Sequence, residues 1–516
     1  MSIASAPPLR NETAYGTAPG KSRRKALLLG AGFAILVALV VGLGPDWIIS
    51  DTALKTMTAT ALLLVPLCLV LAVAKAKGAT AGELTFAVAL LLWWSLLISD
   101  QWFDRASDAE NLYQAQYSVD AYGEVVTWFV AFLILALISF AKPEYLSKLT
   151  RGSYKWVTLF VLASLMACAY SPSRSYSAGW WCKLFVVYLV LALCTSCMEK
   201  ISQMRAFLWS TMWGLLLVCT LAIGAALSDP TTLFAGIEGR LNADPVVLSG
   251  TASCLLIVSL ILNSLHGRLW LKLISLFAVV VTIISFGKTG IVAGAISASI
   301  FFLLQKKLAS SLLVLVGVGA LAAVLVATIT PLGNYFSSYH GGAKLSGRTE
   351  IWKMALPAIK QKPILGHGYL ASKFLFKDQR KVDAASHLHN GFLDTLYNSG
   401  AIGLGLLLAL HGTILANLFR ARKHLSAWKG KETDDLRQAN ILLMGCFALY
   451  LDLLIYGCFT PAFGGRMTDH FMVFLSIVGL SMALESFARG LEKQRVVVPA
   501  PKVWRRGFSI PSPSST

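Results

Sequence analysis

Long apolar segments recur along the whole chain, and they constrain its fold more than any other feature. Many of them extend over about 18 residues or more, which is long enough for a helix to cross a bilayer. Only 14% of the 516 residues are charged, whereas soluble domains carry about 25%. Segments that span a bilayer must pair their own backbone groups, as helices or as a closed barrel. Because the apolar runs are continuous rather than alternating, we predict an all-α polytopic membrane protein.

The runs predict about 12–14 transmembrane helices. They divide the chain into five parts, which are a disordered basic tail (1–25), transmembrane helices (26–330), one large loop with short helices (331–390), C-terminal transmembrane helices (391–488) and a second tail (489–516). The approximate limits of the spans are 26–43, 54–74, 84–99, 124–141, 156–170, 179–197, 206–227, 246–265, 270–286, 289–304, 308–330, 391–419, 437–459 and 468–488.

The charge of the connecting loops predicts the orientation. Basic residues gather in every second loop, as at 142–155 and 420–431, and both tails share this charge. Lys and Arg are enriched in cytoplasmic loops, so we expect these loops and both termini in the cytoplasm. The acidic segment 99–123 and the long loop 331–390 are then expected outside, which is the periplasm if the host is a Gram-negative bacterium. The net charge of +19 follows from this distribution and does not indicate nucleic acid.

Residues 386–394, SHLHNGFLD, lead from the large outer loop into an apolar helix. Asn390 is of a residue type that is favoured at helix N-caps. A neutral histidine at this position can accept a proton from a sugar hydroxyl. His389 is therefore the candidate catalytic residue, with His387, Asn390 and Asp394 as supporting residues. A structural role is the alternative for each histidine. Metal binding is disfavoured, because the outer loops lack an HExxH motif or a carboxylate-rich partner set.

Four cations lie at the outer ends of predicted spans, where the positive-inside rule disfavours them. They are Arg240, Lys288, Arg348 and Arg466. Arginine grips phosphate oxygens with two N–H groups, and lysine supplies a point charge. For each cation alone, snorkelling to lipid headgroups is the alternative. Together, and beside the histidines, they predict a site for a lipid diphosphate.

Three further patterns have structural or open interpretations. Residues 349–362 predict an amphipathic helix on the membrane surface, kinked by Pro357 and ended by PILGHG at 363–368; its apolar face holds Ile351, Trp352, Ala355, Leu356 and Ile359. His367 within PILGHG is equally compatible with a structural and a functional role. Asp452 lies inside a predicted span, where an acid is either functional or paired with another polar group.

Several of these motifs, taken in order, resemble a known family. GRT at 347–349 with Trp352, PILGHG at 363–368, HNGFLD at 389–394 and GAIG at 400–403 are similar to the signature region of the bacterial O-antigen ligase and Wzy-type polysaccharide polymerase superfamily, which includes rhizobial exopolysaccharide polymerisation proteins. The similarity in order and spacing covers about residues 230–410.

The resemblance implies a GT-C-type glycosyltransferase of the bacterial inner membrane, without a cofactor or a catalytic metal. It places the catalytic histidine at His389 and diphosphate-binding arginines at Arg240 and Arg348. A further arginine of the family is usual in a turn between two spans, and Lys288 stands there in this chain. The cations would stabilise the charge on the leaving diphosphate, while His389 would orient or deprotonate the acceptor hydroxyl.

The implied donor is a glycan on undecaprenyl diphosphate, within a membrane of lipids that the protein contacts. The acceptor is either another lipid-linked repeat unit, as in a polymerase, or lipid A core, as in an O-antigen ligase; we favour the polymerase. The resemblance also implies a chain-length regulator and a flippase as partners. A transporter of lipid-linked glycan is the alternative from another class. It would predict broken helices, paired intramembrane charges and matched halves, and the sequence contains one clear mid-span acid and no convincing repeat.

Overall fold

The computed structural model of this chain is all-helical within the part that it describes. The described residues are 78, 80–103, 131–135, 138, 152–228, 245–285, 287–317, 320, 348–375, 388–428, 433–463 and 468–497. Six of their helices are long and apolar enough to cross a membrane, and shorter apolar helices accompany them. The predicted fold class, a polytopic helical membrane protein, is confirmed. The predicted tail at 1–25 and the first two predicted spans lie outside the described residues.

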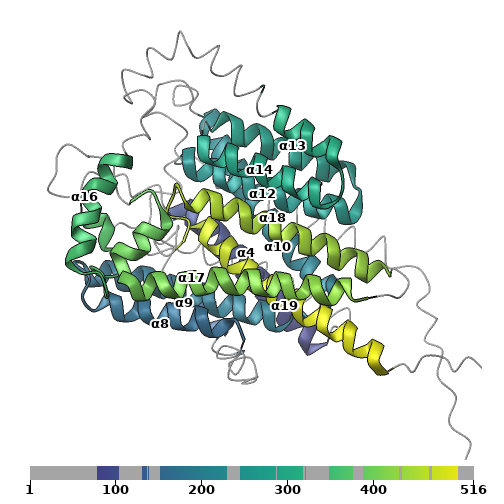
Figure 1. The fold of residues 1–516 in the computed structure, drawn as a ribbon, viewed down its shortest axis with the longest axis horizontal. Helices are drawn as coiled ribbons and strands as arrows, with labels where there is room; N and C mark the ends of the chain where they lie inside the picture. The colour runs from purple at the N-terminus through teal and green to yellow at the C-terminus, as the bar shows by residue number, and fades with distance from the viewer. Residues whose placement is uncertain are drawn as a thin grey trace, which may run out of the picture.

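Most of the helices run side by side along the bundle, and α16 lies at one end of it (Figure 1). Those of the first half are α4 (Ala81–Phe103), α8 (Tyr154–Cys168), α9 (Arg174–Ser196) and α10 (Ile201–Ser228). Next come α12 (Pro245–His266), α13 (Leu269–Ile284) and α14 (Lys288–Leu304). The C-terminal elements are α16 (Arg348–Gln361), the 3-10 helix η3 (Ala371–Phe374), α17 (Gly391–Ser426), α18 (Asp434–Gly457) and α19 (Asp469–Val497).

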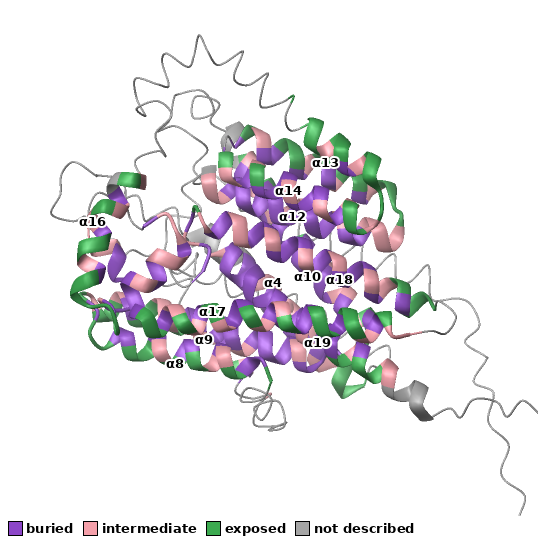
Figure 2. Cartoon of the chain, in the orientation of Figure 1, coloured by how far each residue is buried: buried purple, intermediate pink, exposed green. Residues whose placement is uncertain are grey.

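Helix α19 lies at the centre of the bundle. It packs against α17, α18 and α9 and also touches α12, α10 and α4. In its most apolar stretch 83% of the residues are buried, against 39% in α17. Helices α12, α13 and α14 form one side of the bundle and α8, α9 and α17 the other, with α18 between them (Figure 1). The buried side chains follow this arrangement and concentrate along the inner helices (Figure 2).

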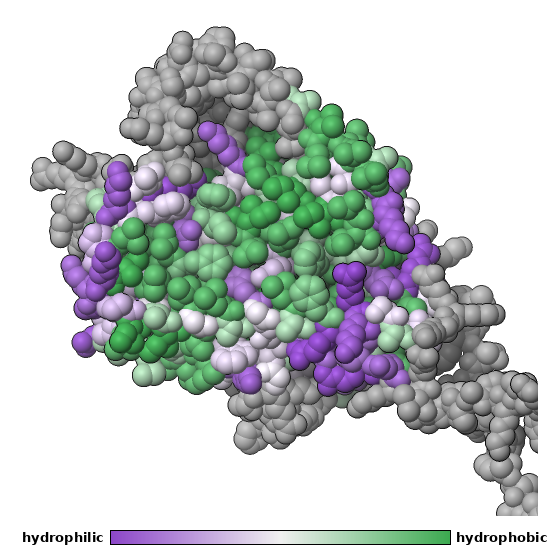
Figure 3. All heavy atoms as spheres, in the orientation of Figure 1, coloured by the Kyte–Doolittle hydropathy of each residue, from purple (hydrophilic) through white to green (hydrophobic). Residues whose placement is uncertain are grey.

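Apolar side chains also cover the outside of the bundle, as expected of a surface that faces lipid. On α13, Leu269, Leu273 and Leu276 are 71%, 58% and 59% exposed, and their spacing puts them on one helix face. Such a row would be unfavourable in water but not among acyl chains. The space-filling view shows a hydrophobic band with hydrophilic side chains near α16 and near the last turns of α17 and α19 (Figure 3).

The two polar ends of the bundle differ in what they carry. At the cap end, α17 and α19 begin, α18 ends, and α16 and η3 cover the bundle. At the basic end, Lys155 lies in the first turn of α8, and the C-terminal parts of α17 and α19 carry Arg420 and Arg489. All the described candidate site residues belong to the cap end. The basic end contains the loops that the charge pattern assigns to the cytoplasm.

Small residues allow the helices to approach one another, because association within a bilayer depends on close packing rather than on the hydrophobic effect. Gly290 in α14 is the clearest example. A Cβ built at this position would lie 2.5 Å from the backbone carbonyl carbon of Ser249 in α12. Since a backbone atom cannot rotate away, α12 and α14 must separate to admit any side chain.

We therefore expect Gly290→Ala to lower the free energy of unfolding by about 1–3 kcal/mol, as overpacking does in other cores. Thermal unfolding of the purified protein in mild detergent measures this effect. Gly224→Ala in α10 is the matched control, since a Cβ there meets nothing within 4 Å. Equal melting temperatures for the two variants would contradict the close contact between α12 and α14.

Candidate functional site at the cap end of the bundle

Helix α17 is broken at Gly400, so the predicted continuous helix from residue 391 to 419 is wrong at this position. Gly400 has φ +63° and ψ −164°, a conformation found essentially only in glycine. The ring of Phe392, before the break, lies 5.4 Å from the ring of His411 after it. A straight helix would separate residues 19 positions apart by about 28 Å. Residues 391–399, the cap helix, therefore fold back on residues 401–426, the long helix.

The strap, residues 363–368 with the sequence PILGHG, fills the break. Two of its amides donate to the last carbonyls of the cap helix, and two of its carbonyls accept from the first amides of the long helix. The four bonds join His367 N to Tyr397 O (2.9 Å), Gly368 N to Asn398 O (2.9 Å), Ala401 N to Pro363 O (2.8 Å) and Ile402 N to Ile364 O (3.3 Å). These groups would otherwise be unpaired at two helix ends. The PILGHG and GAIG motifs are thus two halves of one junction.

Glycine is required on both sides of this junction. A Cβ at Gly400 would lie 2.1 Å from the carbonyl oxygen of Ile364, and a Cβ at Gly366 would lie 2.5 Å from the amide nitrogen of Gly400. Both glycines also have positive φ. Backbone atoms form both obstacles, so neither site can relax by a rotamer change.

His367 has structural partners in this junction. Its Nε2 atom lies 2.8 Å from the carbonyl oxygen of Ala358 in α16. Its ring stacks on that of Tyr397 at 4.5 Å between centroids. The side chain therefore ties α16 to the cap helix, and of the two interpretations of His367 these contacts favour the structural one.

Helix α16 is present as predicted, but its apolar face packs on protein. Ile351, Ala355 and Ile359 are buried in a small second core with Leu388 and Tyr397 of the cap. The indole Nε1 of Trp352 donates to the carbonyl oxygen of Leu388 (2.8 Å). Leu356, which the sequence assigns to the same face, is 47% exposed.

Asn390 caps the cap helix, as predicted. Its Oδ1 accepts from the amides of Phe392 (3.0 Å) and Leu393 (2.9 Å). Its Nδ2 donates to the carbonyl oxygen of Cys458, in the turn after α18 (2.8 Å). The preceding residue, His389, is half-buried and has φ +49°, a region that few residues with a Cβ adopt. The chain thus turns sharply at His389, and Asn390 fixes that turn to α18.

Asp394 supports the same turn from within the cap helix. Its side chain is 1% exposed. Its Oδ1 accepts from the amide of Leu388 (3.4 Å) and its Oδ2 from Nδ2 of Asn398 (3.0 Å). Asn398 in turn accepts through Oδ1 from the amide of Ser372 in η3 (2.8 Å). A buried carboxyl needs such donors, and these contacts link it to the residue just before His389.

Arg348 is the first residue of α16 and faces the same turn after α18. Its guanidinium carbon lies 5.9 Å from the centroid of the Phe459 ring. Its Nε is buried, and no hydrogen-bond partner for it occurs within the described residues. Burial lowers the pKa of the Arg348 guanidinium, and the neighbouring Tyr456 has the opposite, smaller effect on that pKa. Arg348 and Asn390 therefore contact adjacent residues, Phe459 and Cys458.

Lys288 is exposed at the start of α14, also at the cap end. Gly290, in the same turn, packs on Ser249 of α12. The start of α12 is in turn bonded to α18, because the hydroxyl of Tyr456 donates to the carbonyl oxygen of Val246 (2.9 Å). None of the described interactions joins Lys288 to Arg348 or to His389. Arg240, His387 and Arg466 lie outside the described residues and stay predictions.

A buried polar cluster joins α12, α18 and α19, and of its members the sequence indicated only Asp452. Asp452 accepts from Ser253 (2.9 Å) and, more weakly, from the thiol of Cys254 (3.5 Å), so it is a paired acid. Asp469 accepts from Thr251 (3.4 Å). Next to it, the ring of His470 stacks on Tyr456 at 4.3 Å. The sequence feature that could have indicated this cluster is the pair Asp469-His470, which lies at the start of the apolar segment of α19. No group of three His, Cys, Asp or Glu side chains with metal-binding geometry occurs in the described parts of the chain.

The fold and the cap together define a polytopic membrane protein in which hydrogen bonds hold a set of polar side chains in fixed positions at one end of the bundle. Residues 273–408 match the family model described as O-antigen ligase. The matched segment contains Lys288, Arg348, the strap, the cap helix and the break at Gly400. This part of the chain is a domain of the O-antigen ligase family, and the predicted resemblance is confirmed. No match was found among curated proteins.

We expect Gly400→Ala to open the cap. The substitution forces an unfavourable backbone conformation and places a methyl group against the strap, so the free energy of unfolding should fall by at least about 2 kcal/mol. Thermal unfolding measures the loss, and limited proteolysis should show earlier cleavage within 348–400. Gly405→Ala, where a Cβ meets nothing within 4 Å, controls for the change of residue. An unchanged cleavage pattern would argue against the junction.

Proposed function

We propose that this protein is a membrane glycosyltransferase that transfers glycan repeat units from undecaprenyl diphosphate to an acceptor sugar hydroxyl, polymerising an exopolysaccharide or an O-antigen. The observation that carries the proposal is the convergence of two motifs on one turn. Asn390, beside His389, bonds to Cys458, and Arg348 lies over Phe459. A candidate base and a candidate anion-binding group are thereby held at one end of a family domain that acts on lipid-linked glycans.

Arg348 is suited to bind the donor diphosphate. An arginine stays protonated even when burial lowers its pKa, and a partly buried cation attracts an anion more strongly than one in water. Its buried Nε supplies an N–H donor that the described residues leave unused. We propose that Arg240 and Lys288 complete the site, and that the three cations stabilise the negative charge of the departing diphosphate.

His389 is the proposed base. It accepts the proton of the acceptor hydroxyl, whose oxygen attacks the anomeric carbon at the reducing end of the donor glycan. A new carbon–oxygen bond forms as the bond to the lipid diphosphate breaks, with inversion at that carbon. The buried contacts of Asn390 and Asp394 would hold the His389 turn in place. The reaction as proposed uses no metal and no cofactor.

We place the protein in the bacterial inner membrane, with both termini in the cytoplasm and the cap end toward the periplasm. The basic loops support this orientation. The broken helix is a feature that the transporter alternative also predicts. Transporters use the freed backbone groups of such breaks to bind ions or substrate, whereas the four groups at Gly400 bond to the strap. The break therefore supports a fixed cap rather than a transport site.

A strain that lacks this protein, complemented with wild type or His389→Ala, tests the proposal in cells. We expect the variant to lose long exopolysaccharide and to leave single repeat units on the lipid carrier. His424→Ala at the basic end is the histidine control, and membrane expression is checked for each variant. Loss of only the long lipopolysaccharide bands, with polymer still on its carrier, would make the protein a ligase. Full restoration of both polymers would refute the role of His389.

Transfer from a purified lipid-linked repeat unit tests Arg348. We expect Arg348→Gln to lower kcat/KM by about 100-fold, as loss of one charge-stabilising donor does elsewhere, and Arg348→Lys to recover only part of it, since lysine cannot bind two oxygens at once. Lys360→Gln, on the same helix, is the control for a lost charge. Equal rates for Arg348→Gln and Lys360→Gln would remove Arg348 from the site.

A further inference from the structure

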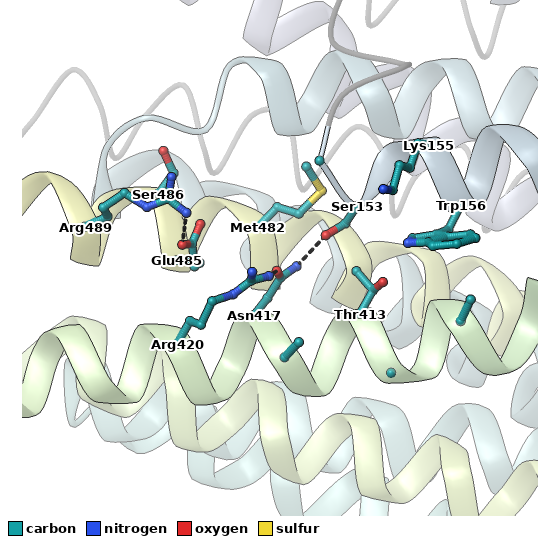
Figure 4. A pocket seen from close by; sticks show the side chains of 14 residues that line it. Ser153, Lys155, Trp156, Thr413, Asn417, Arg420, Met482, Glu485, Ser486 and Arg489 are labelled. Atoms are coloured by element: carbon teal, nitrogen blue, oxygen red, sulfur yellow. Dashed lines mark hydrogen bonds and ion pairs between the residues drawn. The ribbon is translucent and has the colours of Figure 1, made fainter.

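A hollow of about 540 Å³ opens at the basic end, at the opposite end of the bundle from His389 and Arg348. It lies between the start of α8, the long helix and the last turns of α19. Figure 4 shows Asn417 and Arg420 on the long helix opposite Glu485 and Arg489 on α19, with Lys155 at the third side. None of the proposed catalytic chemistry uses these residues.

The charges that line the hollow favour an anion. Arg420 donates to Oδ1 of Asn417 (2.6 Å), and the ammonium of Lys155 lies 5.1 Å from the centroid of the Trp156 ring. Both of these described partners are neutral, so neither cation is neutralised by them. Arg489 pairs with the carboxylate of Glu485, the one acidic group in the lining. Three cations and one carboxylate leave an excess of positive charge.

The floor of the hollow is rigid. Asn417 is buried, and its Nδ2 donates to the hydroxyls of Ser153 (2.9 Å) and Ser481 (3.2 Å). One side chain thereby joins all three elements that surround the hollow, and it also orients Arg420 (Figure 4). A surface arginine that merely snorkels to headgroups needs no such shared floor. A buried side chain that both joins the surrounding helices and orients a cation is typical of a binding site.

The wall formed by the long helix is recessed and mostly apolar. Ala409, Gly412, Thr413 and Ala416 fall on one face of that helix and line the hollow. A Cβ at Gly412 would meet nothing within 4 Å, so the helix surface leaves space there rather than packing on a neighbour. Trp156 and Met482 flank this face. The hollow thus combines cations at the membrane boundary with a groove that runs toward the hydrophobic band.

We propose that this hollow binds an anionic phospholipid. Its phosphate lies between Lys155 and Arg420, and one acyl chain lies along the groove at Gly412. Basic pockets between transmembrane helices are known to hold acidic headgroups in this way. A free phosphate would use the same cations but would gain nothing from the groove. The proposal does not depend on the glycosyltransferase reaction or on the identity of its substrates.

Native mass spectrometry of the full chain in mild detergent tests the proposal, with phosphatidylglycerol and phosphatidylcholine of equal acyl chains as probes. We expect wild type to retain phosphatidylglycerol preferentially. Each cation near a lipid surface contributes about fivefold in affinity, so Lys155→Gln with Arg420→Gln should weaken retention about 25-fold. Arg422→Gln, an exposed neighbour outside the lining, should leave retention unchanged. Equal binding of both lipids by wild type would overturn the proposal.

A second pair of variants tests the groove without changing charge. Gly412→Leu should fill the space and weaken phosphatidylglycerol retention, whereas Gly405→Leu, on the same helix face two turns closer to the break, should not. Inorganic phosphate serves as the competing probe. If millimolar phosphate displaces the lipid and Gly412→Leu binds as wild type does, the hollow is a phosphate site and the lipid assignment is wrong.

Discussion

Four backbone hydrogen bonds hold the strap in the break of α17, and the geometry of the cap end depends on them. A chain that leaves a helix and enters another at Gly400 exposes carbonyls at one end and amides at the other. The strap supplies the complementary groups, and the absence of side chains at Gly366 and Gly400 lets the two backbones touch. This junction pairs the backbone groups that the break leaves open, and the side-chain contacts of Asn390, Asn398 and Tyr397 then hold the cap helix on its neighbours.

The position of the candidate site follows from that reversal. Folding back brings the first turn of the cap helix to the end of α18, where Asn390 bonds to Cys458. The same strap continues from α16, whose first residue, Arg348, reaches Phe459. A rigid backbone junction thus sets the distance between two groups that a transfer reaction would need together. Asp394 and Asn398 add side-chain bonds that keep the turn at His389 closed. The positive φ of His389 costs local stability, and in the proposed reaction this cost would be offset by a base held in a fixed position.

The two proposals place two kinds of anion recognition at opposite ends of the bundle. At the cap end, the half-buried Arg348 lies over the ring of Phe459 and keeps a buried N–H donor that is unused within the described part of the chain, which suits a substrate that enters, reacts and leaves. At the basic end, exposed cations surround a recessed apolar wall, which suits a resident lipid that anchors α8, the long helix and α19 to one another. Helix α19 passes through the centre of the bundle and reaches both ends. A shift of this helix would therefore change the geometry of both proposed sites.

The sequence by itself determined the helical membrane fold, the family and the N-cap at Asn390, because apolar run length, ordered motifs and local hydrogen bonding are properties of neighbouring residues. It also marked Arg348 and Lys288 as cations in an unusual place. Only the tertiary structure decided that α17 breaks at Gly400, since a glycine in an apolar run is compatible with an unbroken helix until a strap from elsewhere occupies the gap. The tertiary structure also decided the partners of His367 in α16 and the cap helix, and the hydrogen bond from Ser253 to Asp452, because these contacts join residues that are distant in the sequence. The contact of Arg348 and Asn390 with one turn joins residues far apart in the chain, and no local pattern encodes such a distance.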